Sequence, residues 1–157
     1  MANKMKLLQS KKLFLAQTDT TAGFLSASKE RICEAKNRPL NRGMLIEASA
    51  LAQVKRISRI PRILGRKMRC AKKTTFIFPN NHSFRVVGDF APYRAHHRFL
   101  SNVGALYSSS ANEGGKKFDY DFAESCAEVV VLDRREICER APSQIFRVRK
   151  NKIRKFR

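Results

Sequence analysis

Short apolar runs recur along the chain and are separated by polar or charged segments. Runs of this length, rich in β-branched and aromatic residues, are typical of β-strands. They predict strands at 12–17, 44–49, 74–78, 83–87, 105–108, 128–133, 143–148 and 152–156. The strands at 74–78 and 83–87 are expected to pair around Pro79-Asn80-Asn81, and the last two to pair across Lys150-Asn151.

Helical spacing of apolar residues, or a capping residue before a short amphipathic run, predicts four helices. They are expected at 28–36, 50–60, 91–103 and 119–126. Ser28 is expected to cap the first, Pro61 to end the second and Pro92 to lie in the first turn of the third. Strands and helices mix without strict alternation. We therefore expect one α/β or α+β domain over residues 1–157, with its core at 12–157, built as a twisted mixed β-sheet flanked by helices.

Length and composition exclude several classes of protein. A chain of 157 residues with 43% hydrophobic content can bury a core without disulfides or metals, and it is not a disordered tail. The four cysteines form no CxxC pair and the three histidines do not complete a site, so we expect no structural zinc. The longest N-terminal apolar run, Leu13–Ala16, is too short for a signal peptide or membrane span. These features predict a soluble, cytoplasmic protein.

The charge is the strongest bulk signal. The chain has 33 Lys and Arg residues against 13 acidic residues, a formal net charge of +20. Such an excess creates a field that attracts RNA, DNA, nucleotides or anionic lipid. The alternative is that part of this charge is merely solvated surface.

Three polar clusters carry candidate chemistry. QTDTTAG (17–23) follows a predicted strand, AKNRPLNRG (35–43) carries three cations beside Pro39, and LYSSSANEGG (106–115) combines hydroxyls, an amide and glycines. Pro39 is expected to extend the chain so that Lys36 and Arg38 project to one side and hold phosphates. Taken singly, each cluster also fits an ordinary loop, turn or solvated basic segment.

Taken in order, these clusters resemble the YrdC/Sua5 family of threonylcarbamoyl-adenylate synthases. The match consists of Gln17-Thr18-Asp19-Thr20, the K-x-R-P segment 36–44, the strands at 75–78 and 84–86, Ser109-Ser110-Ala111-Asn112, and Pro142-Ser143-Gln144-Ile145. It spans residues 12–157. The chain departs from the family pattern at Gln17, Ala71-Lys72-Lys73, Val87, Glu113-Gly114 and Arg147, and its first helical segment is short.

The resemblance implies a twisted mixed sheet with a basic concave face. It implies synthesis of threonylcarbamoyl-AMP from L-threonine, bicarbonate or CO2, and ATP, with release of pyrophosphate. The product would serve the N6-threonylcarbamoyladenosine modification of tRNA through downstream threonylcarbamoyl-transfer proteins. Such a reaction depends on positioning and charge neutralisation rather than on a covalent nucleophile. Mg²⁺ is expected to arrive with ATP, because no dedicated carboxylate cage is visible.

Site residues are assigned from the same motif matches. Lys36, Arg38, Ser110 and Asn112 are the expected catalytic residues. ATP binding is expected from these four together with Arg42 and a terminal basic residue, Arg157 or Lys155. Threonine binding is expected from Thr20, Ser109 and Ser143, with Arg85 pairing with the threonine carboxylate.

Two other functions remain open. One is a non-catalytic protein of the same fold that binds double-stranded RNA or tRNA through its basic face. The other is carbamoyl-adenylate chemistry of the kind found in hydrogenase-maturation proteins, which carry further zinc-finger and acylphosphatase domains that this sequence does not show.

Overall fold

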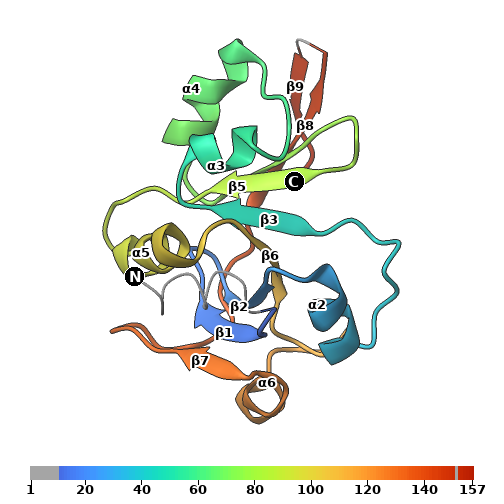
Figure 1. The fold of residues 1–157 in the computed structure, drawn as a ribbon, viewed down its shortest axis with the longest axis vertical. Coiled ribbons are helices and arrows are strands. Elements are labelled where there is room, and N and C mark those ends of the chain that lie inside the picture. The colour runs from blue at the N-terminus through green and yellow to red at the C-terminus, as the bar shows by residue number, and fades with distance from the viewer. Residues whose placement is uncertain (1–10, 151) are drawn as a thin grey trace.

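The computed structural model describes residues 11–150 and 152–157. Within them, nine strands form one mixed sheet in the order β7-β1-β2-β6-β3-β5-β4-β8-β9 (Figure 1). The strands are β1 (Phe14–Gln17), β2 (Ala22–Ser26), β3 (Leu45–Ala48), β4 (Thr74–Ile77), β5 (Ser83–Val86), β6 (Leu106–Ser110), β7 (Val129–Val131), β8 (Gln144–Arg149) and β9 (Lys152–Lys155). The β1–β7, β3–β5 and β4–β8 pairs are parallel and the other neighbouring pairs are antiparallel, so the predicted mixed sheet is confirmed.

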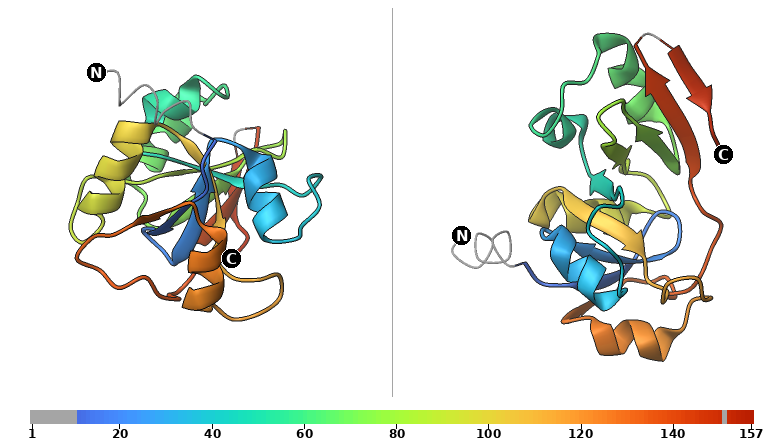
Figure 2. Two further views of the ribbon diagram at one scale, coloured as in Figure 1. Left: turned by 60° about the horizontal axis from the view of Figure 1, so that its bottom comes forward. Right: turned by 90° about the vertical axis from the view of Figure 1, so that its right-hand side faces the viewer.

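Five helices pack on this sheet in the described part of the chain. They are α2 (Lys29–Ala35), α3 (Leu51–Lys55), α4 (Arg62–Cys70), α5 (Arg94–Val103) and α6 (Tyr120–Cys126). At the β1–β2 end, α5 packs on one face, where Leu100 meets Phe14, while α2 and α6 pack on the other (Figure 2, left). Helices α3 and α4 cover the β3–β5–β4–β8 end, where Phe76 and Phe84 are buried.

The period-two alternation of strands explains why one face of this second end stays open. Phe76 and Phe84 are cross-strand partners on β4 and β5, and both are buried in the cluster that α3 and α4 cover. Their neighbours Thr75, Ser83 and Arg85 therefore point to the opposite face, where they line a pocket. On this face α5 reaches β3, where His96 contacts Glu47, but none of the described helices supplies a residue that lines the pocket.

Most predicted elements are confirmed, but four details are wrong. No strand is predicted from the sequence at β2, where Gly23 is unfavourable for a strand. The strand forms because β1 and β6 pair with it on both sides. The predicted helix 50–60 stops at Lys55, and Pro92 precedes α5 instead of lying within it.

The fourth difference is α4, which was not predicted. Its sequence is dominated by Arg and Lys, which hides the apolar stripe. Leu64 and Met68, four residues apart, are buried against the sheet while the cations face outward. Tertiary burial of one narrow stripe is what stabilises this helix.

Candidate functional site

The open face carries a pocket of about 390 Å³ between the two ends of the sheet. Seven of the ten predicted site residues line it: Thr20, Arg38, Arg85, Ser109, Ser110, Ser143 and Arg157. Lys36 and Asn112 meet beside Ser110 at its edge. Arg42 is exposed and is not among the lining residues, so the structure does not bring it to the pocket.

The K-x-R segment reaches the pocket through the way α2 ends. Asn37 has a left-handed backbone (φ 46°). Its N–H donates to the carbonyl oxygen of Glu34, and that of Arg38 donates to the carbonyl oxygen of Cys33 (3.1 and 2.9 Å). This is a Schellman ending, in which Asn is one of the few residues tolerated at the left-handed position. The segment is therefore a tight turn here, and the expectation of an extended path is wrong.

Lys36 links this turn to the serine-rich segment. Its ammonium donates to the backbone carbonyl of Ser110 and, at 3.1 Å, to the side-chain oxygen of Asn112. The Ser110 hydroxyl donates to the same oxygen at 2.5 Å. The amide of Asn112 is held in turn by the carbonyl oxygens of Glu113 and Lys116. These bonds fix Lys36 at the end of β6, where an anion in the pocket can meet it.

Burial changes the acidity of Lys36. Partial burial, together with the neighbouring Arg38 cation, lowers the pKa of Lys36 to about 8 from its ordinary value of 10.5. Arg38 itself is half-buried, and its guanidinium donates to the carbonyl oxygen of Gly43 at 2.6 Å. The rim of the pocket thus holds two adjacent cations that no described carboxylate neutralises. An anionic ligand would relieve their repulsion.

Hydroxyls supply the rest of the polar lining. The Thr75 and Ser143 hydroxyls lie 2.9 Å apart on β4 and next to β8. In the 18–21 turn, the Thr18 hydroxyl donates to the carbonyl oxygen of Thr21 at 2.7 Å and accepts from the N–H of Thr20 at 3.1 Å. The predicted hydroxyl-rich segments at 17–23, 106–115 and 142–145 therefore meet in one pocket.

A second segment holds this turn in place. The Arg135 guanidinium donates to the carbonyl oxygens of Gln17 and Thr18, at 2.6 and 2.8 Å, while it pairs with Asp133. The N–H of Cys138 donates to the Gln17 side chain at 2.9 Å. Sequence reasoning missed this contact, because it joins positions almost 120 residues apart and no local pattern marks it.

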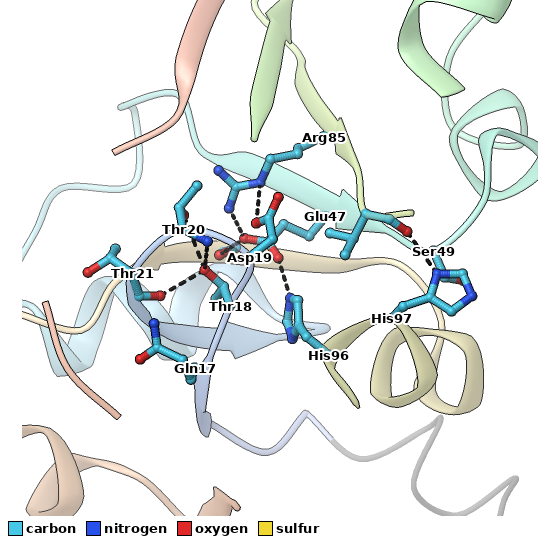
Figure 3. Close-up of polar contacts among 12 residues, drawn as sticks. Gln17, Thr18, Asp19, Thr20, Thr21, Glu47, Ser49, Arg85, His96 and His97 are labelled. Carbon is cyan, nitrogen blue, oxygen red and sulfur yellow. Dashed lines mark hydrogen bonds and ion pairs between the residues drawn. The ribbon is translucent and has the colours of Figure 1, made fainter. Parts of the chain in front are cut away.

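A buried ionic cluster beneath the pocket was also missed. Glu47 on β3 is fully buried and accepts hydrogen bonds from Arg85, His96 and Ser108 (Figure 3). Asp19 Oδ1 lies 3.0 Å from Arg85 Nε in an ion pair whose geometry is poor for a hydrogen bond. A single acid or base inside an apolar strand, as in LIEA and SFRV, is the only sequence signal for such a cluster.

The two carboxylates of this cluster differ in acidity. Burial opposes ionisation of Glu47, but Arg85 and the hydrogen bonds from His96 and Ser108 outweigh it and lower its pKa to about 2. For Asp19, burial outweighs the attraction of Arg85 and raises its pKa, with repulsion from Glu47 adding to the rise. Glu47 is therefore the stronger acid of the two carboxylates beside Arg85.

Arg157 reaches the pocket through main-chain pairing. Its carbonyl oxygen accepts from the N–H of Ile145 at 2.8 Å, and its own N–H donates back at 3.2 Å. This pairing continues the β8–β9 ladder and places the Arg157 side chain among the lining residues. Lys155, the other candidate for this role, lines a separate hollow beside Arg147 and Phe156.

Across 11–150 and 152–157, no three His, Cys, Asp or Glu side chains come together as a metal site. None of the described helices has the length and apolar character to span a membrane.

Comparisons with known proteins identify the fold and the family. The family model for Sua5, YciO and YrdC, described as "Telomere recombination", matches residues 6–157. No curated protein matches the chain. A structure of P. abyssi Sua5 complexed with L-threonine superposes with a TM-score of 0.72 at 17% identity, over 98% of this chain and 53% of that one. A doubly substituted P. abyssi Sua5 gives 0.75 at 18% identity, over 99% of this chain and 52% of that one.

The structure of E. coli YciO gives a TM-score of 0.73 at 14% identity, over 99% of this chain and 86% of that one. The chain thus spans about half of P. abyssi Sua5 and most of YciO. The expected fold, a mixed sheet flanked by helices, is confirmed by these superpositions. The match to the family model covers nearly the whole sequence, and this chain is a member of the Sua5/YciO/YrdC family.

Proposed function

We propose that this protein is an L-threonylcarbamoyladenylate synthase. It would join L-threonine and bicarbonate or CO2 to the AMP part of ATP and release pyrophosphate. The observation that carries this proposal is the meeting of Lys36, Arg38, Ser110 and Asn112 at one edge of a hydroxyl-lined pocket. The L-threonine held by the structurally similar P. abyssi Sua5 supports the choice of amino acid.

The charges suit the reaction. Attack of a carbamate oxygen on the α-phosphorus forms one P–O bond and breaks the bond to the leaving pyrophosphate. Negative charge accumulates on the phosphate oxygens, and cations at the rim stabilise it. Lys36 beside Ser110, and Arg38 and Arg157 among the lining residues, would hold these phosphates. Mg²⁺ would enter with ATP and share this neutralisation.

The hydroxyls suit the amino acid. Thr20, Ser109 and Ser143 line the pocket from three different segments, and each can donate to or accept from a small polar ligand. Holding L-threonine and ATP together converts an encounter in solution into a reaction between neighbours. The hydrogen bonds within the turn at Thr18–Thr21, and those from Arg135 to the backbone of this turn, provide the rigidity that such positioning needs.

Pyrophosphate release from ATP tests the proposal. The purified protein should release pyrophosphate only when L-threonine and bicarbonate are both present. Arg38→Ala should abolish most of this release, because it removes a rim cation. Arg42→Ala, a nearby exposed arginine outside the pocket, is the matched control and should leave release unchanged. Equal loss in both variants, or release without threonine, would rule the assignment out.

A second candidate function, binding of double-stranded RNA or tRNA, is favoured by the distribution of charge. Residues 48–88 and 143–157 carry 17 of the 33 Lys and Arg residues and none of the 13 acidic residues. They form α3, α4, β4, β5, β8 and β9, the upper half of the molecule in Figure 1. Positive charge without acidic neighbours matches a phosphate backbone.

The β8–β9 hairpin is the most concentrated part of this basic half. Arg147 and Arg149 on β8 pair in register with Arg154 and Lys152 on β9, so the four share a face. Phe156, 62% exposed, lies beside them with the Arg147 guanidinium 4.7 Å from its ring. Together with Lys155 these residues line a hollow of their own.

RNA binding can be separated from catalysis by matched double variants. Arg147→Ala with Arg154→Ala should weaken binding of a double-stranded RNA by at least about tenfold at low salt, and should reduce its salt dependence. Arg94→Ala with Arg98→Ala removes the same charge from exposed positions on α5 and serves as the control. Equal weakening by both variants would indicate diffuse attraction and no hairpin site.

A further inference from the structure

The floor of the pocket holds a carboxylate of the protein's own against Arg85. Glu47 and Arg85 are register partners on the parallel strands β3 and β5, so their side chains emerge on the same face. The Arg85 guanidinium donates through Nη2 to Glu47 Oε1. Arg85 lines the pocket, whereas Glu47 is fully buried. Figure 3 shows the two side chains facing each other.

Glu47 is firmly held where it is. Its Oε1 also accepts from the Ser108 hydroxyl at 2.7 Å, and its Oε2 lies 2.7 Å from Nε2 of His96 on α5. Both carboxylate oxygens are therefore satisfied by donors from three different elements. Withdrawing Glu47 from Arg85 would leave a buried carboxylate with fewer donors, which is costly in a site closed to water.

The positive charge of Arg85 is already neutralised by carboxylates of the protein. Glu47 contacts Nη2, and Asp19 lies 3.0 Å from Nε, so two carboxylates face one guanidinium. Arg85, Asp19 and Glu47 are all at most 4% exposed. A ligand carboxylate would be a third negative group around one cation, or would have to displace a carboxylate that loses no translational freedom by binding.

We propose that Glu47 is a specificity-determining residue that occupies Arg85 as an internal carboxylate, so that the pocket floor selects a neutral polar group. A substrate carboxylate gains no ion pair with Arg85 and is left to the hydroxyls, because the phosphates of a bound nucleotide occupy the cations of the rim. This assignment differs from the expected pairing of Arg85 with the threonine carboxylate. It rests on the proposed function for the choice of L-threonine as the probe.

The experiment compares two ligands that differ only in the carboxylate. Calorimetric titration measures the affinity of the full chain for L-threonine and for L-threonine amide, with α,β-methylene-ATP present to occupy the rim cations, in the wild-type protein, in Glu47→Gln and in Glu34→Gln. Glu34 is an exposed glutamate on α2 and serves as the control. Glu47→Gln leaves Arg85 paired with Asp19, so no buried cation is stranded.

The wild-type protein and Glu34→Gln should bind the acid no more than about threefold tighter than the amide. In Glu47→Gln the ratio should rise at least tenfold in favour of the acid, because the loss of one of the two negative charges beside Arg85 removes a repulsion of the ligand carboxylate. A merely structural role would weaken both ligands equally and leave the ratio unchanged.

A strong acid preference already present in the wild-type protein would overturn the proposal. So would an unchanged ratio in Glu47→Gln, including no measurable binding of either ligand by that variant. If Glu47→Gln does not fold, the wild-type comparison decides alone. Threonine-dependent pyrophosphate release with a strong acid preference would leave the proposed function standing and this inference refuted. A gain of acid preference without pyrophosphate release would do the reverse.

Discussion

The ammonium of Lys36 and the side-chain oxygen of Asn112 lie 3.1 Å apart, although 76 residues separate them in the chain. One belongs to the turn that ends α2 and the other follows β6. Their contact joins the basic segment to the serine-rich segment at the edge of the pocket. If this contact orients Lys36 toward the phosphates of a nucleotide, the protonation state of Lys36 should control nucleotide affinity.

Nucleotide affinity should fall as Lys36 loses its proton. With a pKa of about 8, Lys36 is mostly charged at pH 7 and mostly neutral at pH 9. We expect ATP to bind the wild-type protein roughly tenfold more weakly at pH 9 than at pH 7, as measured by calorimetry. Lys36→Arg keeps its charge across this range, so it should remove most of the dependence. The same pH dependence in Lys36→Arg would show that another group is responsible.

Gly23→Ala should damage the pocket more than Gly43→Ala. A Cβ on Gly23 would lie 2.7 Å from Cγ2 of Thr18, whereas one on Gly43 would meet nothing closer than the Asn81 carbonyl oxygen at 3.8 Å. Both glycines line the pocket. We expect Gly23→Ala to lower the free energy of unfolding by about 1–3 kcal/mol in urea denaturation, and to weaken ligand binding. Equal effects of the two substitutions would contradict the close approach of β2 to the 18–21 turn.

Glu47 should stabilise the folded protein above about pH 4.5 and lose this effect in acid. Its pKa is about 2 in the folded protein and near its ordinary value of 4.5 in the unfolded chain. Unfolding therefore takes up a proton as the pH falls below 4.5, and stability declines toward pH 2. Urea denaturation at pH 7 and pH 3 should show a larger loss for the wild-type protein than for Glu47→Gln. Parallel losses would mean that Glu47 is not held as a buried anion.

The cap of α6 offers a test of local stability away from the pocket. Asp119 accepts a hydrogen bond from the N–H of Phe122 at 2.9 Å. Asp119→Ala should lower the free energy of unfolding by about 1 kcal/mol, and Asp119→Asn should restore most of it. Asp121→Ala, in the first turn but outside the cap, is the control. A larger effect at Asp121 than at Asp119 would refute the capping role.

Much of the fold could be predicted because its strands are short apolar runs. The apolar runs TTFI and SFRV, separated by a short turn, predict a pair of neighbouring strands. The register that joins Phe76 to Phe84 follows because one face of this pair is buried. The segments that form α4 and β2 could not be predicted in this way. In α4, the many Lys and Arg residues hide the apolar stripe formed by Leu64 and Met68. In β2, Gly23 is favourable because the Thr18 side chain lies too close to leave room for a Cβ atom.

The candidate site likewise has a part that the sequence predicts and a part that it does not. The composition of three local segments suggested ligand binding, and the pocket brings those segments together. They contain Thr20, Lys36, Arg38, Ser110 and Asn112. The Glu47–Arg85 pair has no local signature. It depends on the parallel register of β3 and β5, which periodicity within either strand does not determine.

The most direct measurement follows the carbon of bicarbonate. The wild-type protein is incubated with ATP, L-threonine and carbon-13 bicarbonate, and the nucleotide products are analysed by mass spectrometry. We expect an AMP adduct that contains threonine and one labelled carbon. This adduct should be absent when threonine is omitted and strongly reduced in Arg38→Ala. Pyrophosphate or AMP without a labelled adduct, or an unlabelled threonine adduct, would contradict the synthase assignment.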